Sequence, residues 1–300
     1  MSSLTTINQQ QTTKGKAMTT RIINTIEDAS IEFVGANKVK RALPTRNLKQ
    51  VDPFIFIDHM VPATVPAGAS IRIPPHPHAG FEVVSYIIDG EFFHRDSKGH
   101  DQIAHPGDIN WMTSGSGIVH SEGPTDQFLE KGGNLELMQV WINLPSDKKR
   151  LEPSFRNYPS ATLPVVENET SRVKVLIGEY EGRTSPVTTH TSMYYYHINV
   201  KAGNTFTLPV KDGYTAGLYV MEGKVKILAD EIKTGQIVQF APEGTQIVFK
   251  ALEDVTLIAF GGEPINEKVV SYGPFVMNSF PEIQEAIANF EAGKMGELTY

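Results

Sequence analysis

The stretch FEVVSYIIDGEFFHRDS (residues 81–97) predicts two β-strands joined by a tight turn. Two apolar runs flank Asp89-Gly90, a dipeptide that favours the turn of a β-hairpin. Comparable short apolar runs follow along the chain, and turn residues separate them at intervals of roughly 8–12 residues. That spacing is typical of a β-sandwich or β-barrel, so we expect an all-β protein.

The predicted hairpin has a counterpart in the second half of the chain. SYIIDGEFFHRD (85–96) matches LYVMEGKVKILA (218–229), 133 residues later, and AHPGDINWM (104–112) matches IKTGQIVQF (232–240), 128 residues later. Two matches in the same order and at nearly the same offset favour a duplicated β-domain. Chance similarity between short hairpins is the alternative.

The expected domain boundaries follow from this repeat. We expect a first domain over residues 18–150 and a second over residues 151–300. The second should end in a helix within FPEIQEAIANFEAGKMG (280–296), where Pro281 suits the first helical turn. Residues 1–17 are rich in Ser, Thr and Gln, and we expect them to form a flexible tail.

Composition excludes several classes of protein. The 300 residues carry a net charge of −7 with acidic and basic residues interspersed, which disfavours direct binding to nucleic acid or to an anionic membrane. The absence of cysteine excludes disulfides, thiolate metal sites, iron–sulfur clusters and a cysteine nucleophile. No apolar run approaches the ~20 residues of a membrane span, and the polar N-terminus lacks the apolar segment of a secretory signal. A cytoplasmic location is the default expectation.

Histidines are concentrated in the first copy of the repeat. Seven of the nine lie between His59 and His120, and HPH (76–78) places two of them at positions i and i+2. Side chains at that spacing share one face of a strand, so both imidazoles can point into the same β-domain. His120 and Glu122 form a second pair at the same spacing. On neighbouring strands, the two pairs would bring together three imidazoles and a carboxylate, a donor set that suits a divalent first-row metal.

The metal hypothesis rests on the two pairs taken together. A lone histidine in a strand is more often a hydrogen-bonded core residue or a surface residue than a ligand, and a single HxH is a weak signal. The other histidines adjoin turns or lack a partner at ligand spacing, and we interpret them mostly as surface or supporting residues: His59, His94, His100, His105, His190 and His197.

Four strings of the sequence resemble the pirin family of the cupin superfamily: HPHAGFE (76–82), DGEFFHRDSKGH (89–100), PGDINWMTSGSGIVHSE (106–122) and SYGPFVMN (271–278). The resemblance implies an all-β bicupin, in which two antiparallel β-barrels of the jelly-roll type pack together and a helix closes the chain. It also implies that metal binds only in the N-terminal barrel. The ligands that it implies are His76, His78, His120 and Glu122.

Glu82 is an alternative carboxylate ligand. It follows the HPH at the spacing that many cupins use for their carboxylate, whereas the pirin pattern supplies Glu122 instead. We expect Glu122 to be the ligand and Glu82 to be a pocket acid that orients an imidazole. A surface or ion-paired position is an equal alternative for Glu82.

The resemblance implies a quercetin 2,3-dioxygenase type of activity. The metal would be iron(II), with manganese, copper, nickel and zinc as alternatives. A flavonol-like substrate and dioxygen would react at its open positions, with Glu122 or Glu82 as the acceptor of a hydroxyl proton. Phe81, Trp111 and Met112 are candidate walls of the substrate pocket, and each is equally explained as core.

The second candidate function is regulatory and not enzymatic. The resemblance to eukaryotic pirins implies a redox-sensing, iron-binding regulator that acts through a protein partner without turnover. A purely structural metal is a third alternative. The bicupin resemblance also implies a monomer, because one chain already contains the barrel pair that single-domain cupins form by dimerising.

Overall fold

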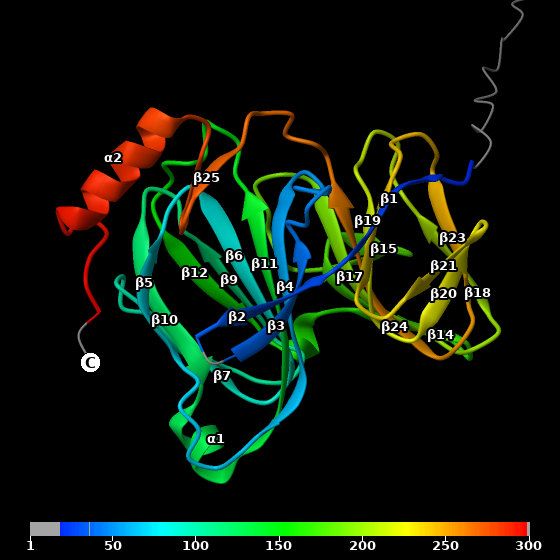
Figure 1. Ribbon diagram of the computed structural model, residues 1–300, viewed down its shortest axis with the longest axis horizontal. Helices are drawn as coiled ribbons and strands as arrows, with labels where there is room; N and C mark the ends of the chain where they lie inside the picture. Colours follow the sequence, from blue (N-terminus) through cyan, green and yellow to red (C-terminus); the bar gives the residue numbers. More distant parts are fainter. Residues whose placement is uncertain (1–18, 36, 299–300) are drawn as a thin grey trace, which may run out of the picture.

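Two β-sandwiches lie side by side in the computed structural model, which describes residues 19–35 and 37–298 (Figure 1). The tail expected over residues 1–17 lies outside these residues. Each sandwich packs a seven-stranded sheet against a four-stranded sheet. The predicted all-β protein with two similar units and a terminal helix is confirmed, although the sheets keep free edges, so each unit is a jelly-roll sandwich and not a closed barrel.

The first unit contains the histidine-rich region. In spatial order, its larger sheet consists of β12 (Ser154–Tyr158), β9 (Ile109–Thr113), β6 (Phe81–Asp89), β11 (Gly133–Asn143), β4 (Phe54–Val65), β3 (Asn37–Leu43) and β2 (Ser30–Val34). Its smaller sheet consists of β5 (Ile73–His78), β10 (Ile118–Pro124), β7 (Phe92–Asp96) and β8 (Asp101–Ala104), and the short helix α1 (Asp126–Lys131) follows β10.

The second unit repeats this plan. Its larger sheet consists of β1 (Ile23–Asp28), β22 (Gln236–Phe240), β19 (Gly217–Glu222), β24 (Val255–Gly262), β17 (Met193–Val200), β14 (Ser171–Ile177) and β13 (Val165–Glu167). Its smaller sheet consists of β18 (Thr205–Pro209), β23 (Gln246–Ala251), β20 (Lys224–Ile227) and β21 (Asp230–Lys233). The remaining elements are a 3-10 turn (Ser160–Thr162), the strand pairs β15 (Glu179–Tyr180) with β16 (Arg183–Thr184) and β25 (Val270–Tyr272) with β26 (Phe275–Met277), and α2 (Phe280–Glu291).

The hairpin predicted over residues 81–97 is wrong in one respect. Both strands form, but β6 pairs with β9 and β11 in the larger sheet, whereas β7 pairs with β10 and β8 in the smaller one. The turn at Asp89-Gly90 therefore carries the chain from one sheet to the other. A Cβ at Gly90 would lie 2.9 Å from the carbonyl oxygen of Asn134, so the residue fits a turn that is closely packed against β11. The matching strands β19 and β20 cross between sheets in the same way.

The two faces of β6 have different neighbours, which determines where each side chain can act. Val83 packs with the interior of the first unit, and the Ser85 hydroxyl points to the same side. Val84 and Tyr86 face the opposite way, into the core between the two units. Because both faces are covered, the strand is buried over its first seven residues.

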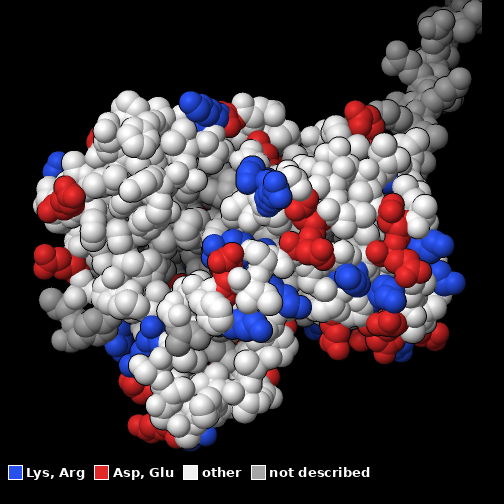
Figure 2. Space-filling model, viewed as in Figure 1, with Lys and Arg blue, Asp and Glu red and all other residues white. Residues whose placement is uncertain are grey.

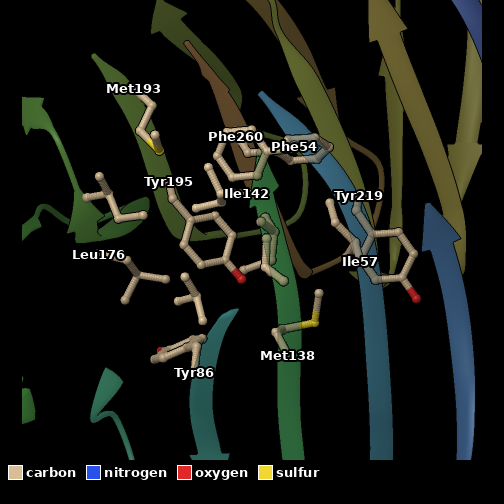
Figure 3. Packing of buried hydrophobic residues seen from close by; sticks show 14 of the residues in the cluster. Phe54, Ile57, Tyr86, Met138, Ile142, Leu176, Met193, Tyr195, Tyr219 and Phe260 are labelled. Atoms are coloured by element: carbon tan, nitrogen blue, oxygen red, sulfur yellow. The ribbon is translucent and has the colours of Figure 1, made fainter. Parts of the chain in front are cut away.

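The core between the units joins residues from both larger sheets (Figure 3). The ring of Phe54 lies 5.1 Å from that of Phe260 and 6.2 Å from that of Tyr195. Tyr86 also approaches His197, with 2.8 Å between the Tyr86 hydroxyl oxygen and His197 Nδ1. The core includes, from the first unit, Phe54, Ile57, Tyr86, Met138 and Ile142, and from the second Leu176, Met193, Tyr195, Tyr219 and Phe260.

The ends of the described chain cross between the units. Strand β1 pairs with β22 at the edge of the second unit. At the other end, Phe275 forms a parallel bridge with Ala79 of the first unit, and α2 buries Ile283 and Ala286 beside it. The helix begins as predicted, with Pro281 in its first turn.

The surface drawn in Figure 2 carries both signs of charge. Lys and Arg side chains lie beside Asp and Glu side chains, mainly over the centre and right of this face, in line with the interspersed charges of the sequence. Among the described residues, no helix has the length and hydropathy needed to cross a membrane.

The core between the units should make a large contribution to stability. Phe260 is fully buried there, so Phe260→Ala should lower the free energy of unfolding by about 3–5 kcal/mol through lost contacts and a cavity. Denaturant unfolding measures this. Phe33 is 69% exposed, and Phe33→Ala should change stability by less than about 0.5 kcal/mol. Equal effects of the two substitutions would contradict the arrangement of the core.

His197 should make folding sensitive to acid. Burial, helped by the positive charges of Arg172 and Lys174, lowers its pKa from 6.5 to about 4. Between these values the unfolded chain binds the extra proton, so stability falls as the pH drops from 6.5 to 4, by up to about 1.4 kcal/mol per pH unit. Urea titrations of the wild type and of His197→Gln, repeated across this range, should give a stability difference that shrinks towards pH 4. A difference that is independent of pH would contradict the prediction.

Candidate metal centre

His76, His78 and His120 converge inside the first unit. β5 pairs with β10 so that His120 lies directly opposite His76. The ring centroids are 4.3 Å apart for His76 and His120, 5.0 Å for His78 and His120, and 4.8 Å for His76 and His78. One ring nitrogen of each lies within 4.8 Å of the other two, a spacing that one metal ion can span. The three histidines that the sequence analysis placed on two neighbouring strands are therefore brought together.

The proline-rich sequence of β5 suits its place in the sheet. The strand lies at an edge, beside β10 only. Pro74, Pro75 and Pro77 have no N–H to donate to a ladder, and an edge strand tolerates this loss. The strand alternation then turns His76 and His78 to the same side.

Backbone carbonyls determine the tautomers of two imidazoles. His76 Nδ1 lies 2.8 Å from the carbonyl oxygen of Pro74, and His78 Nδ1 lies 3.3 Å from that of Pro274. A carbonyl oxygen can only accept, so Nδ1 carries the proton in both rings. The lone pair of each Nε2 is then left for a metal, which is the arrangement that carbonyl partners of ligating histidines generally produce.

His120 is buried without a hydrogen-bonding partner. Its exposed fraction is 0%, and neither ring nitrogen has a partner among the described residues. A buried polar group without a partner costs roughly 1–3 kcal/mol. A metal ion at the centre of the three rings would provide the missing interaction, so these residues fit a metal.

The imidazoles are held in the neutral form that a metal needs. Burial lowers the pKa of His78 to about 3 and lowers that of His120 far below its ordinary value, and the neighbouring imidazoles add to both effects. Burial likewise lowers the pKa of His76. Near neutral pH, all three rings can therefore offer a lone pair.

Glu122 lines the same cavity as His76 and His78 but is held by other side chains. Its two oxygens accept hydrogen bonds from Gln139 Nε2, at 3.0 Å, and from Ser85 Oγ, at 3.3 Å. Burial is the main cause that raises its pKa to about 7. The close cluster itself contains only the three imidazoles, so the place of Glu122 among the ligands stays a prediction.

Glu82 points away from the three imidazoles. It lies on the face of β6 that carries Val84 and Tyr86, and its Oε1 accepts hydrogen bonds from Trp111 Nε1 and Thr113 Oγ1 at 3.0 and 2.9 Å. The same oxygen lies 2.9 Å from Nδ1 of His190, which belongs to the second unit. The imidazole that Glu82 contacts is thus a residue of the other unit, because strand alternation turns position 82 to the opposite face from Ser85. This placement does not support proton transfer by Glu82 at the cluster.

The three candidate pocket residues are divided between two sides of the sheet. The Phe81 ring lies 5.1 Å from that of His78, and Met112 packs with Phe81 in the same interior cluster. Trp111, in contrast, lies in the core between the units and donates to Glu82. None of the three lines the cavity itself. Trp141, which the sequence analysis missed, does line the cavity, and its ring centroid lies 4.5 Å from that of Phe81.

The histidine cluster borders a cavity of about 760 Å³, which is lined by His76 and His78 but not by the more deeply buried His120. One wall is aromatic, since Phe56 and Trp141 stack with their ring centroids 4.4 Å apart. Beside this wall, Arg41 forms a bidentate ion pair with Asp58, with distances of 2.8 and 2.7 Å, and its guanidinium lies 4.6 Å from the Phe56 ring centroid. The volume is in the range that binds small organic ligands, typically ~300–1,000 Å³. No motif identified these residues, because their spacing is that of ordinary strands.

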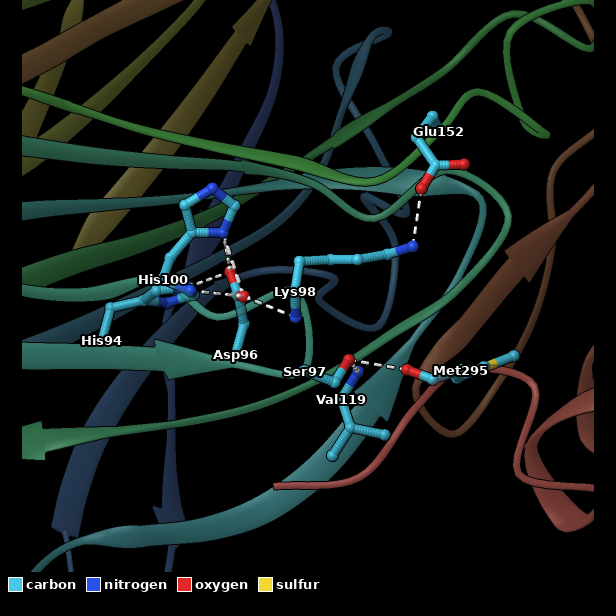
Figure 4. Close-up of polar contacts among 8 residues, drawn as sticks. All are labelled: His94, Asp96, Ser97, Lys98, His100, Val119, Glu152 and Met295. Atoms are coloured by element: carbon cyan, nitrogen blue, oxygen red, sulfur yellow. Dashed lines mark hydrogen bonds and ion pairs between the residues drawn. The ribbon is translucent and has the colours of Figure 1, made fainter. Parts of the chain in front are cut away.

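His94 lies behind the cluster and is held by an acidic neighbour (Figure 4). Its ring lies 5.3 Å from that of His120 and stacks at 3.9 Å on Phe155. His94 Nε2 is 3.0 Å from Asp96, and the same carboxylate is 2.9 Å from Nδ1 of His100, which is partly exposed. His94 is therefore a buried supporting residue, as expected of this group.

The remaining histidines have partners of their own. The His59 ring is buried between Tyr219 of the second unit and Glu136, with nitrogen–oxygen distances of 3.2 and 2.9 Å. His105 lies at the surface, 3.7 Å from Glu91. His59 is thus an interface residue, and the clustering of seven histidines in this region overstates the number near the metal site.

The cluster predicts one metal ion per chain. Protein loaded with nickel(II) and then desalted should retain about one equivalent, because the described residues contain a single group of converging donors. His120→Ala should lose most of this metal, since one coordinate bond disappears. His105→Ala, which removes an exposed imidazole, is the matched control and should retain it. Elemental analysis measures the content, and two tightly held ions per wild-type chain would contradict the prediction.

Comparison with known proteins identifies the family. Residues 36–142 match the family described as Pirin, and residues 195–296 match the Pirin C-terminal cupin domain. A pirin-like protein of Caulobacter vibrioides is 36% identical over 277 residues, which cover 91% of this chain and 95% of that protein. Human pirin is 34% identical over 271 residues, which cover 88% and 90%.

Solved structures share the fold. A quercetin 2,3-dioxygenase from Acinetobacter baumannii has a TM-score of 0.89 at 30% identity, and the match covers 94% of this chain and 100% of that one. The bacterial pirin YhhW from Escherichia coli, in complex with nickel(II), has a TM-score of 0.62 at 17% identity, covering 80% and 99%. Together with the matches over both units, these relatives show that the chain belongs to the pirin family.

Proposed function

We propose that this chain is a metal-dependent dioxygenase of the quercetin 2,3-dioxygenase type, with iron(II) as its metal and a flavonol-like aromatic compound as its substrate. The observation that carries the proposal is the His120 ring, which is fully buried and has neither nitrogen paired among the described residues. It lies against His76 and His78, and these two line a cavity of about 760 Å³. A structural metal would not need a cavity of this size beside it.

The proposed donor set is His76, His78 and His120 with Glu122 as the carboxylate. These residues leave positions open on an octahedral ion, as catalysis requires. When bound, the metal supplies the Lewis-acid and redox chemistry that a reaction between a flavonol and dioxygen needs. Two relatives support the proposal. One is a quercetin 2,3-dioxygenase, which supports the activity, and another was solved with nickel(II), which supports the presence of a metal.

The cavity wall suits a flat, aromatic substrate. The Trp141 ring lies 5.2 Å from that of His78, so a ring system packed against the Phe56–Trp141 stack would reach the metal ligands. Asp58 and Arg41, at the end of the same wall, offer an acceptor and donors for the hydroxyl groups of such a compound.

Glu122 is the proposed acceptor of the substrate's hydroxyl proton. The carboxylate lines the cavity beside His76 and His78, so a substrate hydroxyl bound there would lie near a group that can accept its proton. Ser85 and Gln139 donate to it, which fixes its orientation. Glu82 is equally buried but has no access to the cavity, so it provides a matched control.

The activity is tested with the iron(II)-loaded protein and quercetin in air. We expect oxygen uptake above that of free iron, with Glu122→Gln lowering turnover by ~10²–10⁴-fold, as the loss of a general base does, and more steeply than metal content. Glu82→Gln should leave turnover within a few-fold of the wild type.

The absence of oxygen uptake above free iron would overturn the dioxygenase proposal. A ferric form that captured a partner which the ferrous form did not would then favour the redox-sensing regulator. A larger loss of turnover in Glu82→Gln than in Glu122→Gln would instead refute the assignment of the base.

A further inference from the structure

The last part of the described chain supplies one side of the metal cavity. Residues 269–276, between the second unit and α2, contribute Val269, Ser271, Gly273, Pro274 and Val276 to its lining. We call residues 269–277 the roof segment. It returns from the second unit to the first, so the cavity is built from segments nearly 200 residues apart.

The roof segment is joined to the strand that carries His76 and His78. Phe275 bridges Ala79, and the Val276 N–H donates to the Ala79 carbonyl at 3.0 Å. One residue earlier, the Pro274 carbonyl accepts from His78 Nδ1. Gly80 has φ +89°, and a Cβ there would collide with the carbonyl oxygen of Val276. The two backbones therefore approach as closely as a glycine permits.

A buried lysine lies at this junction. Lys149 is 2% exposed, and its ammonium donates to the carbonyl oxygens of Gly80 and Val276 at 2.9 and 3.1 Å and to Asn143 Oδ1 at 2.7 Å. All three acceptors are neutral oxygens. Burying an ammonium without a paired carboxylate is costly, and burial does lower the pKa of Lys149, to about 8.

The contacts of the ammonium show what is gained by burying it: one group links two segments of the backbone. The Lys149 ammonium donates to the Gly80 and Val276 carbonyls at once, so it joins the end of β5 to the roof segment. The carbonyl that orients His78 is two residues before Val276 and is fixed by the same junction.

We propose that Lys149 is a positioning residue of the metal site: it fastens the roof segment so that the Pro274 carbonyl holds His78 with Nε2 directed at the metal. This inference rests on the metal centre proposed above, and it adds a residue that touches neither the metal nor the substrate. It also explains why the segment SYGPFVMN belongs to the same site as HPHAGFE, although almost the whole second unit lies between them in the sequence.

The test compares two buried lysines. Lys149→Met removes the ammonium at the junction and keeps the length of the side chain. Lys174→Met is the matched control, because Lys174 is 4% exposed, donates to the Gly107 carbonyl and to Ser160 Oγ at 2.7 Å each, and has its pKa lowered to about 8 mainly by burial. It does not line the cavity.

The readouts are nickel(II) affinity by calorimetry and the absorption spectrum of the cobalt(II) form. Losing the partner of a ligating histidine weakens metal binding by ~10–100-fold, so Lys149→Met should do so and alter the cobalt spectrum, while Lys174→Met should change affinity by less than about threefold. Thermal unfolding of the metal-free variants checks that both are folded.

A second pair of variants covers a failure of Lys149→Met to fold. Gly80→Ala should separate the roof segment from β5 and weaken nickel binding in the same way. Gly203→Ala is its control, since Gly203 has φ +81° in the second unit with no atom within 4 Å of the added Cβ. Folded Lys149→Met or Gly80→Ala protein with wild-type affinity and spectrum would overturn the inference. A wild type that binds no nickel(II) would overturn the metal centre itself, and the inference with it.

Discussion

An imidazole buried without a hydrogen-bonding partner is the constraint on which this site depends. His120 is fully buried in the first unit, and neither of its ring nitrogens has a partner among the described residues. Placing it there is tolerable only if something else bonds to it. The pairing of β5 with β10 brings His76 opposite, and the Pro74 and Pro274 carbonyls direct the other two lone pairs inward. A single cation held between the three rings would bond to one nitrogen of each.

The second unit has the same fold but no cluster of buried histidines among its described residues. Its interior is filled by apolar and aromatic side chains, including Tyr194, Phe206 and Phe249. The positions that match His76 and His78 hold Pro209 and Lys211. That unit instead contributes to the first through the shared core and through the segment that follows it. The two units therefore have different roles. The first carries the candidate metal ligands, and the second supports it through the shared core and the roof segment.

Much of this arrangement could be predicted from the sequence, and the exceptions have physical causes. The histidine pairs were recognisable because i, i+2 spacing maps directly onto one face of a strand. The strand pairing of residues 81–97 was mispredicted because an Asp-Gly turn looks the same whether it joins two strands of one sheet or two sheets. Glu82 lies on the opposite face from the cluster, in the ion-paired alternative, because the chain turns at Gly80 between β5 and β6 and spacing from His78 no longer predicts the face. Trp141, Lys149 and Pro274 gave no local signal, since their roles arise only from contacts between distant segments.

The crossing of the chain ends has a consequence for synthesis. A ribosome completes every strand of the first unit before it makes residue 270, yet the carbonyl that orients His78 arrives only with Pro274. The cavity of the first unit therefore lacks its roof segment until the second unit has been synthesised. Long-range closures of this kind come late in folding, because loop entropy has to be overcome first. The final geometry of the three histidines therefore depends on residues that are synthesised long after the histidines themselves.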